Sequence, residues 1–271
     1  MPDYKDPYIT SIKRANTHRM LYHYTSTKAL YKIIKSRKLR LSRLSLVNDP
    51  LEGERLDSYT KDKVYVACFN HYPHDSIPLW AMYVPGRDRA RPFRDGVRIA
   101  FPHENTSFLS DPKQYTIVEV DRRQLSLQSF DDWRLWGDPS LLDVVYDDDF
   151  SKFIMLKDVY DDDSMKVGVP NAIGYLKKKC WAFEGETRLR VAFRHTGLGV
   201  KSYTNKGFEY IEPPFEYIYC NVPNETLQNM QIMFSPCMDD ALCNKIQKTV
   251  KGYFSGFDDR NFVHSSVNIR W

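Results

Sequence analysis

Two hydrophobic periodicities follow one another along the chain and predict a domain of mixed strands and helices. Apolar or alternating runs predict strands at 20–24, 39–42, 64–69, 97–101, 115–121, 143–146, 186–193, 208–212, 215–221 and 230–234. Apolar residues at helical spacing predict helices at 27–36, 77–84, 172–182 and 238–253. No repeat and no low-complexity linker interrupts this order. The pattern therefore predicts an α+β fold in a single domain spanning 20–271, preceded by a polar N-terminal arm at 1–19.

One further helix start is predicted by residue type alone. Asp49 fits an N-cap, Pro50 fits the first helical turn, and Glu52 stands at the spacing of a capping box. In a capping box the two acidic side chains satisfy backbone N–H groups that the first helical turn leaves unpaired. We expect a helix to begin at this point.

Composition and charge exclude some classes of protein. Hydrophobic residues make up 42% of the chain and charged residues 27%, which excludes a disordered chain. The formal net charge is only +4, but residues 1–60 hold 12 Lys or Arg against 6 Asp or Glu. A basic N-terminal face of this kind would attract a nucleotide or nucleic-acid phosphate, and an ordinary solvated surface explains the same counts.

Cysteine usage and the N-terminus indicate a cytoplasmic protein. The five cysteines include no C-x-x-C pair, and an odd number without a secretory signal is typical of reduced thiols. The first residues contain no apolar segment, and no run is long enough to span a membrane. We expect no membrane partner.

The sequence contains no recognised metal-binding or phosphate-binding motif. The seven histidines form no H-E-x-x-H helix and no His/Cys pair at zinc spacing, and His71 and His74 are separated by a sequence typical of a loop. There is no Walker loop, no G-x-G-x-x-G and no G-x-S-x-G elbow. The sequence predicts neither a metal site nor a P-loop or Rossmann nucleotide site.

Two polar features remain as candidate chemistry. His23 stands in an apolar strand between Tyr22 and Tyr24, where a hydrogen-bonded structural histidine is an equal alternative. Glu184 and Glu186 stand two residues apart at the start of an alternating strand, so strand geometry would point both the same way. Their repulsion would raise the pKa of one of them. The alternative is a surface ladder in which Arg188 pairs with these carboxylates.

Four motifs together resemble a known family. L-Y-H-Y-T-S before a helix, N-D-P-L-E, C-F-N followed by S-I-P-L-W-A-M-Y, and W-x-x-E-x-E-x-R occur in this order. In order and rough spacing they resemble the bacterial domain-of-unknown-function family 2971, over roughly residues 20–270. That family is similar in fold to ADP-ribosyltransferases, with a mixed β-sheet core and flanking helices.

The resemblance implies a set of residues that bind NAD as substrate. His23 would form a hydrogen bond with the ribose near the nicotinamide. The aromatic ring of Tyr83 or Tyr24 would stack on the nicotinamide, and Arg188 or Arg40 would hold a phosphate. The full implied set is His23, Tyr24, Thr25, Tyr83 and Arg188.

The same resemblance implies catalytic roles for His23, Glu184 and Glu186. Glu186 would stabilise the oxocarbenium ion formed as nicotinamide departs, and Glu184 would orient or deprotonate an acceptor. No metal is needed for this chemistry. The middle element of the transferase pattern, an aromatic-Ser-Thr or Tyr, is not cleanly met in this sequence.

The leading functional hypothesis is NAD-dependent ADP-ribosyl transfer or NAD cleavage, as in a bacterial toxin or phage-defence effector. The acceptor stays open among protein, nucleic acid, small molecule and water. One alternative is a non-catalytic nucleotide or nucleic-acid binding domain that uses the basic face and the aromatics. A second is a ribosyl-phosphate enzyme acting on RNA ends from a His-centred cleft.

Overall fold

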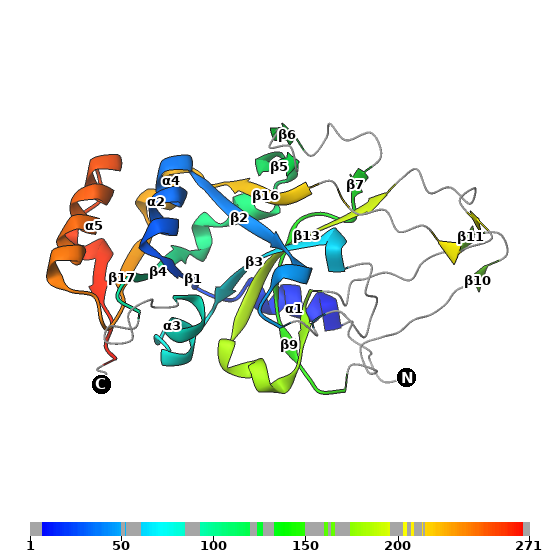
Figure 1. Cartoon of the computed structure of the whole chain (residues 1–271), viewed down its shortest axis with the longest axis horizontal. Helices are drawn as coiled ribbons and strands as arrows, with labels where there is room; N and C mark the ends of the chain where they lie inside the picture. Colours follow the sequence, from blue (N-terminus) through cyan, green and yellow to red (C-terminus); the bar gives the residue numbers. More distant parts are fainter. Residues whose placement is uncertain are drawn as a thin grey trace.

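The computed structural model describes residues 7–49, 52, 61–84, 93–119, 124–126, 133–149, 160–161, 164–165, 174–195, 203–204, 207–208, 213 and 215–267. Within them, twelve strands connect into one mixed sheet whose main path runs β18-β17-β4-β1-β3-β2-β16-β5-β6. Helices lie against it (Figure 1). The fold is α+β, as the sequence predicts.

A long antiparallel pair, β4 and β1, lies in the middle of the main path. β1 (Met20–Ser26) pairs with β4 (Gly96–Pro102) over all seven of its residues. Ser26 ends β1 and caps α2 (Thr27–Ser36), because its hydroxyl accepts the Ala29 N–H at 3.2 Å. The chain leaves α2 through Arg37 in a left-handed conformation and enters β2 (Lys38–Arg43). The helix therefore fixes where β1 ends and β2 begins.

β3 (Val64–Asn70) is the junction of the sheet. One edge of β3 meets β1 at Asn70 and β2 at Val66, so two branches of the sheet diverge from it. Its other edge pairs with β13 (Glu186–His195) from Asn70 to Val64. The C-terminal end of β3 therefore lies between β1 and the start of β13.

The remaining strands extend these branches or form small separate pairs. Those of the main sheet are β5 (Tyr115–Glu119), β6 (Gln124–Ser126), β7 (Trp133–Leu135), β8 (Ser140–Asp143), β16 (Phe215–Asn221), β17 (Gln231–Phe234) and β18 (Phe262–His264). The separate pairs use β9 (Val145–Tyr146), β10 (Tyr160–Asp161), β11 (Ser164–Met165), β12 (Leu176–Lys177), β14 (Tyr203–Thr204) and β15 (Gly207–Phe208).

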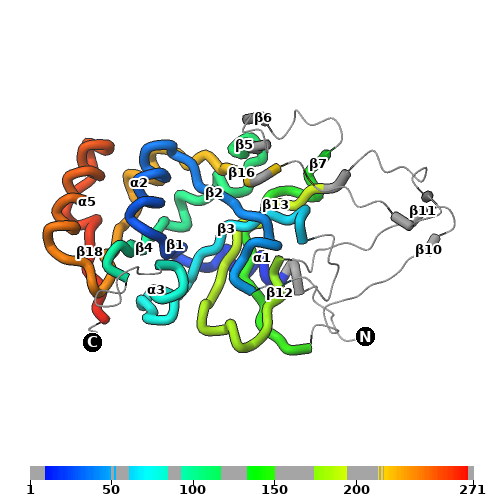
Figure 2. Tube along the Cα trace, viewed as in Figure 1, coloured from blue at the N-terminus to red at the C-terminus, as the bar shows by residue number. Residues whose placement is uncertain are grey.

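The helices cover parts of the sheet. α5 (Asp240–Tyr253) lies beside α2 at one end of the molecule (Figures 1 and 2). The others are α1 (Pro7–Ala15), α3 (Ile77–Tyr83) and α4 (Asn224–Gln228). The largest core cluster joins the apolar face of α2, the inner side chains of β1 and β4, and an aromatic group that includes Phe193 and Phe215 at 4.9 Å between ring centroids.

Most predicted elements are present, and one is wrong. The predicted helix at 172–182 is instead β12 followed by a 3-10 helix, η7 (Lys179–Glu184), while residues 172 and 173 lie outside the described part. β12 runs parallel to β9, with Leu176 opposite Val145, so tertiary strand pairing overrides the helical spacing. In the predicted strand at 208–212, residue 208 ends β15 and the rest lie outside the described residues.

Two sequence expectations near the chain start are changed. Residues 7–15 of the predicted arm form α1, whose Ser11 and Ala15 are buried against the sheet. Pro50 and Leu51 lie outside the described residues, and the Glu52 carboxylate binds Arg188. The predicted capping role of Glu52 is therefore wrong, because a buried guanidinium takes its carboxylate. None of the described helices is long and apolar enough to cross a bilayer.

Candidate active site

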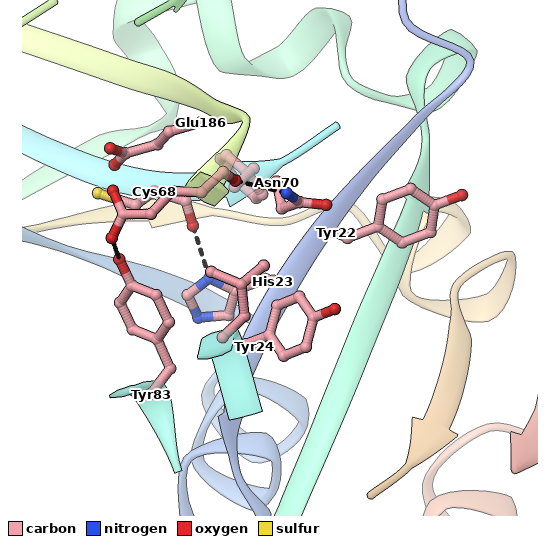
Figure 3. A pocket seen from close by; sticks show the side chains of 10 residues that line it. Tyr22, His23, Tyr24, Cys68, Asn70, Tyr83 and Glu186 are labelled. Atoms are coloured by element: carbon pink, nitrogen blue, oxygen red, sulfur yellow. Dashed lines mark hydrogen bonds between the residues drawn. The ribbon is translucent and has the colours of Figure 1, made fainter. Parts of the chain in front are cut away.

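A pocket opens where β1, β3, α3 and the start of β13 meet (Figure 3). It holds about 340 Å³ of empty space, part of it open to solvent. Its walls are Tyr22, His23, Tyr24, Cys68, Phe69, Asn70, Leu79, Tyr83, Glu184 and Glu186. Five of these, namely His23, Tyr24, Tyr83, Glu184 and Glu186, are site residues predicted from the sequence.

His23 enters the pocket from β1 in a fixed tautomer. Its Nδ1 lies 2.9 Å from the Cys68 carbonyl oxygen on β3, which only accepts a hydrogen bond, so Nδ1 carries the proton. Burial lowers the pKa of His23 despite that hydrogen bond. The ring is therefore neutral near pH 7, and Nε2 keeps a free lone pair as an acceptor.

A glycine turn brings the two glutamates together. Glu184 ends η7, Gly185 adopts φ +45°, and Glu186 begins β13, so the predicted common strand geometry is wrong. The left-handed Gly185 redirects the chain between them. Both carboxylates still converge, because Lys177 Nζ from β12 forms an ion pair with Glu184 and lies 3.4 Å from Glu186.

Behind the carboxylates lies a buried charge network. Arg188 Nε and Nη2 bond the Glu186 carboxylate at 2.8 and 2.9 Å, and Nη2 bonds Glu52 at 3.0 Å. The predicted pairing of Arg188 with Glu186 therefore occurs, but not on the surface, since only 1% of the Arg188 side chain is exposed. In all, three carboxylates face two cations.

The carboxylates of the network differ in the direction of their pKa shifts. Burial alone would raise the pKa of Glu186, but Arg188 and Lys177 outweigh burial and lower it to about 2. Burial and the charge of Glu186 raise the pKa of Glu184 despite Lys177. The sequence-based expectation that one pKa of the pair is raised agrees in direction, with burial as the larger cause. Burial also raises the pKa of Glu52.

The two candidate stacking tyrosines differ in their surroundings. Tyr83 donates its hydroxyl proton to Glu184 Oε1 at 2.9 Å, and burial raises its pKa, so the phenol stays protonated. In Figure 3 its ring extends from α3 toward the carboxylates, beside His23. Tyr24 instead packs edge-on against Trp80 at 4.8 Å and accepts the Ser76 N–H. Tyr83 is therefore the ring held closest to the acids.

The other predicted residues lie outside the pocket wall. Thr25 is buried one residue beyond Tyr24, Arg188 lies behind Glu186, and Arg40 is exposed on β2 with its guanidinium 5.4 Å from the centre of the Tyr217 ring. Neither arginine is placed to hold a phosphate in this pocket.

Sequence reasoning missed Lys177 and Cys68. Lys177 stands in a run of three lysines whose pattern gives no sign that the first is buried, and its role depends on β12 pairing with β9. Cys68 follows the apolar pattern of a core residue, yet its thiol faces Glu186, which together with burial raises the pKa of the thiol. Asn70, also in the pocket wall, orders the glycine turn by donating from Nδ2 to the Glu184 carbonyl.

A second polar cluster lies on the other face of β13. Thr187 points away from its neighbours Glu186 and Arg188, as alternation requires, and donates to Asp143 Oδ1 at 2.6 Å. His18 Nε2 bonds both Asp143 oxygens at 2.8 and 2.9 Å, and the ring of His71 stacks on that of His18. His74, the histidine nearest to His71 in sequence, is instead exposed on the following loop.

No protein-family model matches this chain, and neither does any curated protein or solved structure.

Proposed function

We propose that the pocket binds NAD and that the protein breaks the bond between nicotinamide and ribose, passing ADP-ribose to an acceptor or to water. The observation that carries the proposal is the meeting of His23, Tyr83, Glu184 and Glu186 in one pocket from three distant segments. The four sequence motifs that resemble family 2971 imply the same activity, although no family model matches the chain. This activity would suit a bacterial toxin or phage-defence effector.

The charge of the site favours a cationic reacting group. With Glu52, Glu184 and Glu186 ionised against Lys177 and Arg188, the buried network has one negative charge in excess. The nicotinamide ring of NAD is positive, and the positive charge moves to the ribose as the bond breaks. Such a site stabilises the transition state where the charge develops.

Each pocket residue has a role that suits its environment. The C1′–N bond breaks with its electron pair leaving on nicotinamide, and ionised Glu186 stabilises the resulting oxocarbenium ion. Glu184, whose pKa is raised, accepts the proton of the acceptor or water as the new bond to C1′ forms. His23 Nε2 accepts a hydrogen bond from a ribose hydroxyl, and the Tyr83 ring lies beside the nicotinamide.

The test is nicotinamide release from NAD by the wild-type chain and by Glu186→Gln. In this variant Arg188 keeps Glu52 and Lys177 keeps Glu184, so two carboxylates face two cations and the fold should persist. We expect release to fall by about 100-fold or more, on the scale of a lost electrostatic contact to the transition state. A folded Glu186→Gln protein with full activity would refute the role of Glu186.

A second candidate is the non-catalytic nucleotide or nucleic-acid binding domain. The observation that favours it is a strip on β2 and β16, where Lys38 lies 5.6 Å from the Tyr219 ring centre and Arg40 lies 5.4 Å from that of Tyr217. Basic and aromatic side chains together suit single-stranded nucleic acid. Binding that weakens with salt and with Arg40→Ala, but not with Glu186→Gln, would favour this alternative.

A further inference from the structure

The second polar cluster collects metal-ligating atoms from three distant segments. His18 follows α1, His71 follows β3, and Asp143 ends β8. One ligating atom from each lies within 4.8 Å of the other two. The carboxylate is fully buried, whereas the two imidazole side chains keep 18% and 13% of their surface exposed. The cluster is therefore closed behind the carboxylate and reachable from the histidine side.

The distances between these ligand atoms lie on either side of the distance expected between two atoms that bind the same ion. At Zn–N and Zn–O lengths near 2.0–2.1 Å, tetrahedral ligand atoms are about 3.4 Å apart. His18 Nε2 lies 2.8 Å from Asp143 Oδ1, and His71 Nδ1 lies 3.8 Å from the same oxygen. Each contact is thus about 0.5 Å from the coordinated spacing. Rotation of the two histidine side chains would be needed to span that difference.

We propose that His18, His71 and Asp143 bind one divalent transition-metal ion such as Zn²⁺ or Co²⁺. Two imidazole nitrogens and one carboxylate oxygen are a donor set typical of these ions, and water completes the coordination. The two rings are stacked 6° from parallel with centroids 4.3 Å apart, so binding requires one ring to tilt until both nitrogens point at the ion. The Thr187 hydroxyl lies 3.0 Å from His71 Nδ1. Its hydrogen bond to His71 would be replaced when Nδ1 binds the ion.

Among the described residues, Arg14 is the only other cation close to the Asp143 carboxylate, and it is held weakly. Arg14 Nε lies 3.6 Å from Asp143 Oδ2, and 57% of the Arg14 side chain is exposed, so it can swing into solvent when an ion arrives. His18 directly follows the turn that ends α1, so the ion would fasten this helix to β8 and β3. The cluster is on the face of β13 away from the pocket, and the proposal does not depend on NAD cleavage.

Sequence spacing does not reveal such a site. Motif searches look for ligand pairs a few residues apart, and these three ligands are separated by more than 50 residues each, as their numbers show. The sequence therefore predicted no metal site, because only the pairing of β13 with β3 and β8 brings His71 near Asp143.

The experiment is a titration of the chelator-treated full chain with Co²⁺, followed by visible absorption, and with Zn²⁺, followed by thermal unfolding. The variants are His71→Ala and, as matched control, His74→Ala, which removes a histidine three residues away outside the cluster. Co²⁺ absorption reports on nitrogen and oxygen ligands and separates this site from adventitious binding by the free cysteines.

We expect the wild-type chain and His74→Ala to bind one equivalent, with the unfolding midpoint raised by about 5 °C at an ion concentration 100 times the dissociation constant. His71→Ala should lose at least tenfold in affinity. Because His71 is near the surface, this variant should fold. An absence of binding, or equal binding by all three proteins, would overturn the proposal.

Discussion

Gly185 separates the two pocket glutamates, and replacing it should be costly for two separable reasons. Its φ of +45° is a left-handed conformation, which costs an alanine about 1 kcal/mol. A Cβ at this position would also overlap the ring of Tyr72, with Cζ of the ring only 2.7 Å away. Gly137 has a similar φ of +76°, but a Cβ added there would meet only open space, so Gly137→Ala isolates the conformational cost.

The steric part follows from the burial of Tyr72. The residue is 47% exposed, so the ring can swing outward and give up its edge contact with His71. Losing about 100 Å² of buried ring surface at about 25 cal/mol/Å² costs about 2.5 kcal/mol. Gly185→Ala should therefore destabilise the chain by about 3.5 kcal/mol and Gly137→Ala by about 1 kcal/mol.

Urea unfolding of both variants measures these costs, and a Tyr72→Ala background provides the decisive control. There the ring is absent, so Gly185→Ala should cost only about 1 kcal/mol, like Gly137→Ala. If Gly185→Ala and Gly137→Ala are equally destabilising in the wild-type background, the contact between Gly185 and Tyr72 does not limit the turn and the reasoning fails.

Three further predictions concern the charge network. Arg188→Leu leaves Glu52 and Glu186 buried without their guanidinium and should cost about 3–5 kcal/mol in urea unfolding; a loss below about 1 kcal/mol would contradict the pairing. The pKa of Glu186 is lowered from 4.5 to about 2, so its contribution to stability is complete above pH 4.5 and is lost as the pH falls from 4.5 towards 2. Glu186→Gln should flatten the stability profile in that window, whereas an unchanged slope would show that Glu186 is not held ionised. Tyr83→Phe removes one hydrogen bond to Glu184 and should cost about 1–2 kcal/mol by thermal unfolding, whereas no change would mean that water replaces the phenol.

Local pattern was sufficient for the elements whose apolar side chains face one core. β1, α2, β3, β4 and α5 lie where periodicity places them, because each buries one consistent set of positions. The segment at 172–182 was not predictable in this way. Its backbone pairs with β9, and Gly174 at φ +91° precedes that pairing.

The candidate site was partly visible for a similar reason. His23 and the two glutamates stand out because polar residues interrupt apolar strands. Lys177, Glu52 and the cluster around Asp143 were not visible, since their roles depend on contacts between segments far apart in sequence. Residue type identified candidate catalytic side chains, but the hydrogen-bond partners and protonation states of these side chains depend on how the chain packs.

The measurement that tests the central claim most directly is mass-spectrometric detection of free nicotinamide from NAD incubated with the wild-type chain, with and without cell lysate to supply an acceptor. His23→Ala and Glu186→Gln are measured beside it, with folding checked by circular dichroism. We predict release by the wild-type chain that both folded variants lose. No release in either mixture, together with no detectable NAD binding, would contradict the account and leave the binding domain as the better explanation of the fold.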